Sequence, residues 1–214
     1  MSLTNILNLL NGAYLTLEIS VASIAVGLSL GVFLGVLNCQ RLRFFPVSTL
    51  ISTYITIMRG TPLFVQILLL YFGLPAVSGL NFSPFVAGVI ALGLNSTAYI
   101  AEIIRAGINS IPPGQWEASK MLGYSSFQTL YFIILPQTMR TILPPLTNEI
   151  VVLVKESSIL MVVGVPELTK VSKDIVSREM NPMEIYLIAG LFYLAFTSFI
   201  SFALKKLEGR INAY

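Results

Sequence analysis

Two glutamates stand in a stretch of sequence that is otherwise apolar enough to enter a membrane. Glu149 and Glu156 are seven residues apart, which is two helical turns, so both carboxylates would lie on one face of a helix. If that helix enters the bilayer near Arg140, nine residues at ~1.5 Å each place Glu149 ~14 Å deep, about the middle of the hydrocarbon. A carboxylate at that depth costs on the order of 2.5 kcal/mol or more unless it meets a partner or a water-filled cavity.

A structural alternative for Glu149 is an ion pair within the chain. Arg140 and Lys155, the candidate partners, are nine and six residues away. Neither spacing puts a basic residue on the neighbouring helical turn. The sequence therefore favours a binding role for Glu149.

A second polar stripe lies on an earlier apolar segment. Asn95, Tyr99 and Glu102 recur at i, i+4 and i+7, which is one face of a helix. Asn95 and Tyr99 are candidate ligand-binding residues, but hydrogen bonding to neighbouring helices is an equally good role for them. We expect Glu102, three residues from Arg105, to be structural.

Two further polar positions are less defined. Gln66, one helical turn beyond Pro62, is a candidate cavity residue. Glu18 is the only charge in the first apolar segment, and it has two open roles: lining a pore, or pairing with Arg59.

Composition places these residues in a bilayer. The chain of 214 residues is 55% hydrophobic and 11% charged, with a mean hydropathy of +0.82, and such a chain cannot cover a water-facing surface with polar groups. Cys39 is the single cysteine and histidine is absent, so we expect no disulfide, no metal and no redox chemistry. The net charge of +3 is scattered at segment ends, which fits the positive-inside rule better than nucleic-acid binding.

We predict an all-α membrane protein with five crossings, at about residues 14–37, 47–72, 82–104, 142–163 and 185–204. The first nineteen residues contain no Lys or Arg, so we expect an uncleaved first span instead of a signal peptide. In that span Ser23, Gly27, Gly31 and Gly35 form a smooth stripe that lets another helix approach closely. Pro62 predicts a kink or break in the second span.

An odd number of crossings puts the termini on opposite sides. With the N-terminus outside and the C-terminus in the cytoplasm, eight basic residues fall inside: Arg41, Arg43, Arg105, Lys120, Arg140, Lys205, Lys206 and Arg210. Four fall outside: Lys155, Lys170, Lys173 and Arg178. The positive-inside rule favours this orientation.

The segment from Glu117 to Pro136 is more polar than the long apolar segments on either side of it. Glu117 and Lys120 flank the small residue Ala118, and Gly123 follows as a pivot. A helix with small side chains on one face, located where a helix bundle meets the aqueous phase, can dock into a groove on another protein. The alternative is an ordinary helix-turn-helix connection.

The spacing of this segment resembles the coupling loop of ATP-binding-cassette import permeases: Glu, Ala, a small residue, three residues, Gly, nine residues, Ile, any residue, Leu, Pro. Three further motifs resemble the polar-amino-acid branch of that family: the run 59–63 (RGTPL), the run 95–105 and the run 164–168 (GVPEL). The resemblance covers about residues 14–204. It implies a single permease domain over 1–214, of the type I importer fold, with a cytoplasmic coupling loop at 105–140.

The resemblance also implies partners. These are a second permease subunit in a homodimer, two ATPase subunits that hold ATP and Mg²⁺, an extracytoplasmic binding protein that delivers an amino acid, and the lipid of a prokaryotic inner membrane. In that family the loop at Glu117, Ala118, Lys120 and Gly123 docks into the ATPase. No GxxxxGK[ST] phosphate loop occurs in the chain, so we expect it to be no enzyme and to bind no cofactor itself.

The implied cargo is a polar amino acid. Asn95 and Tyr99 would hold its α-carboxylate and α-amino groups. Related permeases often carry a neutral amide where this chain has Glu149, and the departure favours a basic cargo such as arginine, lysine or histidine, because a guanidinium pairs bidentately with a carboxylate.

Two other functions compete with import. An ion channel or an ion-coupled carrier working without ATP could use Glu18, Glu102 and Glu149 as an ion path. A membrane-embedded hydrolase would need a nucleophile with a base, which the lack of histidine disfavours. The charged run 167–184 has two interpretations, a solvated outer surface or a landing site for the binding protein.

Overall fold

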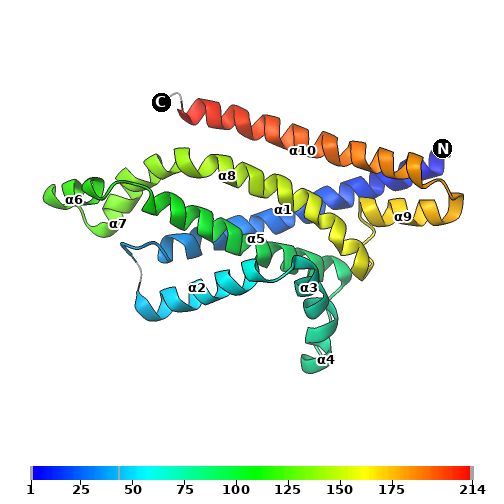
Figure 1. The fold of residues 1–214 in the computed structure, drawn as a ribbon, viewed down its shortest axis with the longest axis horizontal. Coiled ribbons are helices and arrows are strands. Elements are labelled where there is room, and N and C mark those ends of the chain that lie inside the picture. The colour runs from blue at the N-terminus through cyan, green and yellow to red at the C-terminus, as the bar shows by residue number, and fades with distance from the viewer. Residues whose placement is uncertain (1, 43, 213–214) are drawn as a thin grey trace.

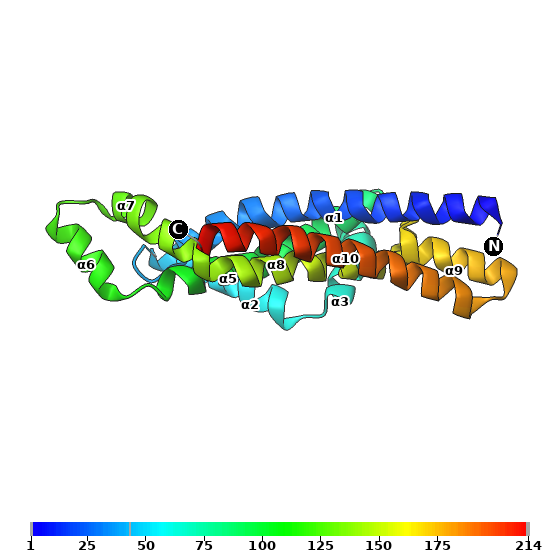
Figure 2. The same ribbon diagram turned by 90° about the horizontal axis from the view of Figure 1, so that it is seen from above.

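The helices of this protein run mainly along one long axis. The computed structural model describes residues 2–42 and 44–212, and Arg43 of the expected cytoplasmic loop lies outside that part. Four long helices, α1 (Leu3–Leu37), α5 (Pro84–Asn109), α8 (Leu135–Glu156) and α10 (Pro182–Asn212), follow this axis in both views (Figures 1 and 2). The start of α1 and the end of α10 lie at opposite ends of the molecule.

Three of these helices, α1, α5 and α10, are long and apolar enough to span a membrane. A fourth candidate is a bent pair, in which α2 (Phe45–Gly60) meets the helical stretch Leu63–Ser78 at an angle of 105°. That stretch comprises α3 (Leu63–Leu68), a π-helical turn (Leu69–Gly73) and α4 (Leu74–Ser78), and the break falls at Pro62 as the sequence predicts. The chain is therefore a helical membrane protein with three or four apolar helices, and α8 packs beside α5 and α10 as a more polar companion.

The predicted glycine stripe of α1 packs against α5. A Cβ atom placed on Gly27 would lie 2.9 Å from Ser96 Oγ, and one on Gly31 would lie 2.7 Å from Ile100 Cβ. At Gly35 the obstacle is the backbone, since the added Cβ would be 2.6 Å from the carbonyl oxygen of Ala101. These glycines allow a close approach of two helices and the van der Waals contact that holds membrane helices together.

Residues 3–13 extend the first helix beyond the predicted start of the span. The Ser2 side chain caps α1 by accepting the backbone N–H of Asn5. The extension then packs on α9 (Leu168–Glu179), with Gly12 against the backbone of Leu168. This extension precedes the predicted span at 14–37 and is compatible with it, because a helix can continue beyond the hydrocarbon core.

The end of the molecule that holds α9 is fixed by a buried carboxylate. Glu167 is fully buried, and its side chain accepts the backbone N–H groups of Thr169 and Lys170 at the start of α9. The hydroxyl of Tyr193 on α10 donates to the same carboxylate at 2.9 Å. The Thr16 hydroxyl of α1 accepts the N–H of Leu168, so one polar cluster joins α1, α9 and α10.

Candidate functional site

Glu149 is half-buried on α8 and faces α5. Its carboxylate lies on the side of α8 that meets Ser96 of α5. The Ser96 Oγ atom is buried and has no hydrogen-bond partner among the residues that the structure describes. Within the described part of the chain, neither Arg140 nor Lys155 forms an ion pair with Glu149, so the structural alternative for this residue finds no support.

Glu156, the other predicted acid of this helix, is the last residue of α8. It is half-buried, and a 3-10 helix (Ser157–Val163) continues the chain from it. Pro144 and Pro145 lie inside α8 on the preceding turns, where each removes a backbone N–H from the helical ladder. The helix is visibly curved (Figure 1).

Asn95 and Gln66 meet at the break between α2 and α3. Pro62 has no N–H to donate, so the Met58 carbonyl one turn earlier lacks its helical partner. Gln66 Nε2 donates to that carbonyl at 2.8 Å, and Asn95 Nδ2 donates to it at 3.4 Å and to Gln66 Oε1 at 2.9 Å. These two amides therefore stabilise the break, which is the helix-linking role that the sequence left open for Asn95.

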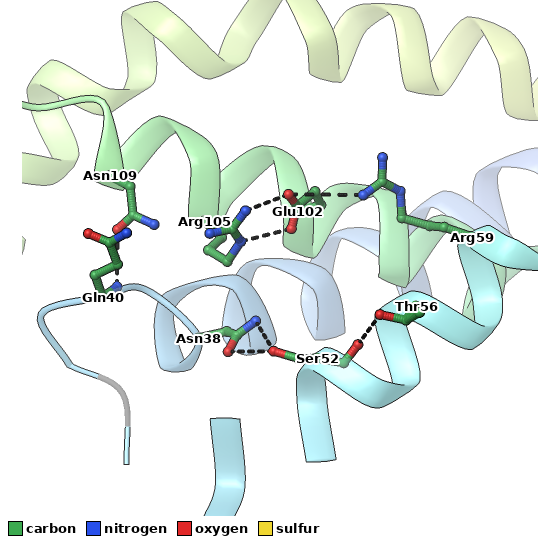
Figure 3. Close-up of polar contacts among 8 residues, drawn as sticks. All are labelled: Asn38, Gln40, Ser52, Thr56, Arg59, Glu102, Arg105 and Asn109. Atoms are coloured by element: carbon green, nitrogen blue, oxygen red, sulfur yellow. Dashed lines mark hydrogen bonds and ion pairs between the residues drawn. The ribbon is translucent and has the colours of Figure 1, made fainter. Parts of the chain in front are cut away.

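Arg59 pairs with Glu102, as Figure 3 shows. The distance from Arg59 Nη1 to Glu102 Oε1 is 4.0 Å. Arg105 holds the same carboxylate more closely, with Nε 2.8 Å from Oε2 and Nη2 2.6 Å from Oε1. The Arg59 guanidinium also lies over the ring of Tyr99, 5.2 Å from its centroid. Asn95, Tyr99 and Glu102 thus form the predicted stripe, and it faces α2.

Glu18 does not pair with Arg59. It is exposed, and it lines a cavity of about 670 Å³ between the first part of α1 and α9. Asp174 and Arg178 of α9 line the same cavity. Of the two roles left open for Glu18, the structure contradicts the pairing.

A polar cavity of about 550 Å³ lies between α2 and α5. Its lining includes Arg59, Glu102 and Arg105 together with Asn38, Ser52 and Thr56. Asn38 Nδ2 donates to Ser52 Oγ at 3.2 Å, which fixes the end of α1 to α2 (Figure 3).

Sequence reasoning missed the α2 side of this cavity. A signal was present, because Ser52, Thr56 and Arg59 recur at i, i+4 and i+7. This stripe faces the equivalent stripe of α5, and the two polar faces line the cavity beside an apolar contact of Ile51 and Ile55 with Ala98 and Ala101.

The predicted coupling residues lie at one end of the molecule, beyond the long helices. Helix α6 (Pro113–Met121) carries Glu117, Ala118 and Lys120 exposed, while Trp116 and Ser119 are buried. Gly123 follows with φ of +84°, a left-handed conformation that favours glycine. The chain turns at Gly123, and α6 lies at the end of the molecule beyond the long helices (Figures 1 and 2).

The chain returns from this end to the long helices through α7 (Ser126–Thr129). Ser125 and Gln128 form a reciprocal capping box at its start. A π-helical turn (Leu130–Ile134) then leads into α8 just before Pro136, and this wider turn suits a helix that must accommodate a proline.

Known proteins resemble this chain over nearly its whole length. The model of the family described as binding-protein-dependent transport system inner membrane component matches residues 27–213. The glutamine transport system permease protein GlnP of Escherichia coli K12 is 38% identical over 205 residues, covering 95% of this chain and 93% of that protein. The arginine transport system permease protein ArtQ of Bacillus subtilis 168 is also 38% identical, covering 96% and 93%.

A solved structure agrees with the sequence matches. The crystal structure of an amino acid ABC transporter with histidines superposes with a TM-score of 0.89 at 36% identity, covering 98% of this chain and 100% of that one. These matches extend over the long helices and over the α6–α7 segment alike. The chain belongs to the family of inner membrane components of binding-protein-dependent transport systems.

Proposed function

We propose that this chain is the membrane-spanning subunit of an ATP-driven importer that carries polar amino acids, specifically basic ones such as arginine, lysine or histidine, by alternating access. The observation that carries the transport role is the exposed helix α6, which stands outside the long helices of a chain from this family. Relatives named for glutamine and arginine transport support an amino acid as cargo.

The coupling mechanism follows from the position of α6. Its exposed residues Glu117, Ala118 and Lys120 dock into an ATPase subunit that holds ATP and Mg²⁺, with Gly123 as the pivot. ATP binding closes the paired ATPases and carries α6 with them, and hydrolysis reverses the movement. The work then reaches the substrate path through α7 and α8, which form a nearly unbroken helical path from Ser126 to Glu156.

The proposed topology has five crossings: α1, the bent α2–α3 pair, α5, α8 and α10. The N-terminus is outside and the C-terminus is in the cytoplasm. The opposite ends of the molecule at which α1 begins and α10 ends support an odd number of crossings (Figure 1). The working assembly is a homodimer of this chain, two ATPase subunits and a binding protein that delivers the amino acid from outside.

The preference for a basic cargo depends on Glu149. Sequence identity does not decide it, because the relatives named for glutamine and for arginine are equally similar at 38%. Among the described residues, the half-buried carboxylate of Glu149 has no ion-pair partner. The buried hydroxyl of Ser96 on the facing helix has no hydrogen-bond partner among them either. A guanidinium or ammonium group would supply the missing charge.

The other predicted substrate residues have supporting roles. Glu156 on the same helix extends the acidic face, and Tyr99 on α5 lies beneath the Arg59 guanidinium. Asn95 and Gln66 are engaged with each other in this structure, so they would reach a substrate only if the break between α2 and α3 rearranges.

The decisive experiment reconstitutes the chain into liposomes with and without its ATPase and binding protein. Uptake of radiolabelled L-arginine should require all components and ATP. Uptake by the chain alone, without ATP, would establish the alternative function, an ion channel or an ion-coupled amino-acid carrier.

A variant tests the cargo preference. Glu149→Gln should abolish uptake of basic amino acids while the complex still assembles, because the amide keeps the size of the side chain and loses its charge. Glu208→Gln near the end of α10, where an amide oxygen can still accept the Thr147 hydroxyl, serves as the matched control and should transport normally. Unchanged arginine uptake in Glu149→Gln would remove this residue from the substrate path.

A further inference from the structure

The guanidinium of Arg59 carries a charge that its surroundings leave largely uncompensated. Both carboxylate oxygens of Glu102 accept hydrogen bonds from Arg105, at 2.8 and 2.6 Å, and such a bidentate pair neutralises the acid. Arg59 reaches the same carboxylate only at 4.0 Å (Figure 3). Two cations share one anion, so this wall of the cavity keeps a net positive charge.

Arg59 is nevertheless held in place. Its guanidinium lies over the Tyr99 ring at 5.2 Å, and a contact with the ring face fixes the group without using its N–H donors. The side chain is 42% exposed. No hydrogen bond within residues 2–42 and 44–212 uses an Arg59 side-chain donor, so the planar fork is available for a ligand.

The cavity in front of Arg59 has the size and lining of a small-molecule site. Its volume of about 550 Å³ falls within the range of ~300–1,000 Å³ found for ligand pockets. Asn38, Ser52 and Thr56 add an amide and hydroxyl groups to the lining. This set of groups suits a planar anion such as a carboxylate, which a guanidinium binds bidentately.

Arg59 is also the better placed residue for the carboxylate end of an amino acid. Asn95, the earlier candidate, has its amide committed to Gln66 and to the Met58 carbonyl. Glu149 of α8 is not among the residues that line this cavity. Arg59 would therefore recognise the carboxylate end that all amino acids share, separately from the side chain of the cargo.

We propose that Arg59 binds the α-carboxylate of the transported amino acid in the cavity between α2 and α5. The inference rests on the proposed function and adds to it the group that recognises the end common to all amino acids. Tyr99 is then a positioning residue, since it supports Arg59 from below the guanidinium plane.

The test replaces the carboxylate of the ligand by an amide and the guanidinium of Arg59 by the amide of glutamine. Each replacement is made alone, and then both are combined. Binding of L-arginine and of L-argininamide is measured by scintillation proximity on the permease–ATPase complex in detergent, with L-glutamine and L-glutaminamide as a second pair. In the wild type each amino acid should bind about 10- to 100-fold more tightly than its amide, the range expected for a hydrogen bond between charged groups. In Arg59→Gln this ratio should fall to about one.

Three variants make the result specific. Arg59→Lys keeps the positive charge but lacks the planar guanidinium, so the ratio of acid to amide binding should be intermediate. This variant can be measured even if Arg59→Gln does not fold. Arg210→Gln, an exposed change near the end of α10, should keep the wild-type ratio. Glu149→Gln should weaken L-arginine and L-argininamide together and leave their ratio intact, so a failure of the basic-cargo proposal is seen separately from a failure of the carboxylate site.

Two outcomes overturn the inference. One is a wild-type ratio that persists in both Arg59 variants. The other is a pair of results. The wild type binds the amino acid and its amide equally well, and phosphatidylglycerol added to the detergent raises the melting temperature of the wild type but not that of Arg59→Gln. That second result would assign the cavity to a lipid phosphate.

Discussion

Replacing Gly35 with alanine is the most direct test of the contact between α1 and α5. The added Cβ would lie 2.6 Å from the Ala101 carbonyl oxygen and 2.7 Å from Ile104 Cβ, whereas ordinary contacts begin at 3.4 Å. The shortfall of about 0.8 Å at the carbonyl cannot be removed by rotating a side chain, because the obstacle is backbone. The two helices must therefore move apart.

The cost follows from that displacement. A gap of ~0.5–1 Å forfeits a quarter to a half of each dispersion contact that it opens, and roughly 20 to 30 contacts of ~0.15 kcal/mol from Ile100 and Ile104 would lose ~1–2 kcal/mol. Residual overpacking strain raises the total toward ~3 kcal/mol, and the better helix propensity of alanine returns at most ~1 kcal/mol. We expect a net destabilisation of ~1–2 kcal/mol, or ~2–8 °C in melting temperature for a chain of this size.

The assay is thermal unfolding of the purified chain in detergent, followed by size-exclusion chromatography of the remaining monodisperse fraction. Gly190→Ala in α10 is the matched control, because an added Cβ meets nothing within 4 Å there, and its melting temperature should stay level or rise. Equal melting of the two variants would show that the close approach at Gly35 does not stabilise the fold.

Three further changes test other parts of the structure. Glu117→Lys on exposed α6 should release the ATPase from the purified complex or abolish its stimulated hydrolysis, while Glu184→Lys at the other end should not; a normal complex for both would contradict docking through α6. Gly123→Ala, at φ of +84°, should cost ~1–2 kcal/mol in thermal unfolding, whereas Gly114→Ala, with open space around it, should cost nothing comparable. Burial raises the pKa of the Glu167 carboxyl, and the hydrogen bonds from two backbone N–H groups lower it by less. Because the pKa is higher in the folded state, the free energy of unfolding increases as the pH falls through that pKa. The melting temperature of the wild type relative to Glu167→Gln should therefore rise on acidification, and a difference independent of pH would refute this.

The elements of the fold that the sequence predicted are those that local chemistry determines. Pro62 lacks an N–H and the chain breaks there, and Gly123 adopts the left-handed turn that its position required. The period-four glycines faced another helix as expected, though nothing in their spacing identified α5 as the partner. Helix α1 begins about eleven residues before the predicted span, because hydropathy indicates the part in contact with lipid and not the contact of the first residues with α9.

The candidate site was predicted less completely. The α5 stripe was predicted, but the facing stripe of Ser52, Thr56 and Arg59 on α2 was not, because the sequence does not show which face of α2 meets α5. Which acid meets Arg59 depends on how far two helices slide past one another, and no local pattern encodes that distance. The use of Asn95 to satisfy the Met58 carbonyl likewise depends on a contact across 37 residues of sequence.

The length of α1 has a mechanical consequence. Its 35 residues make a rod of ~52 Å, and a tilt of ~20° does not shorten it to the ~30 Å of a hydrocarbon core. The first residues of α1, which exceed the length of a hydrocarbon core, are attached to α9 by two contacts. Asn5 donates a hydrogen bond to Glu179, and Gly12 packs against the backbone of Leu168. A force on α9 would therefore act on α1, whose other end packs against the Ala101 carbonyl of α5. The two ends of the long helices are thus mechanically connected within a single helix.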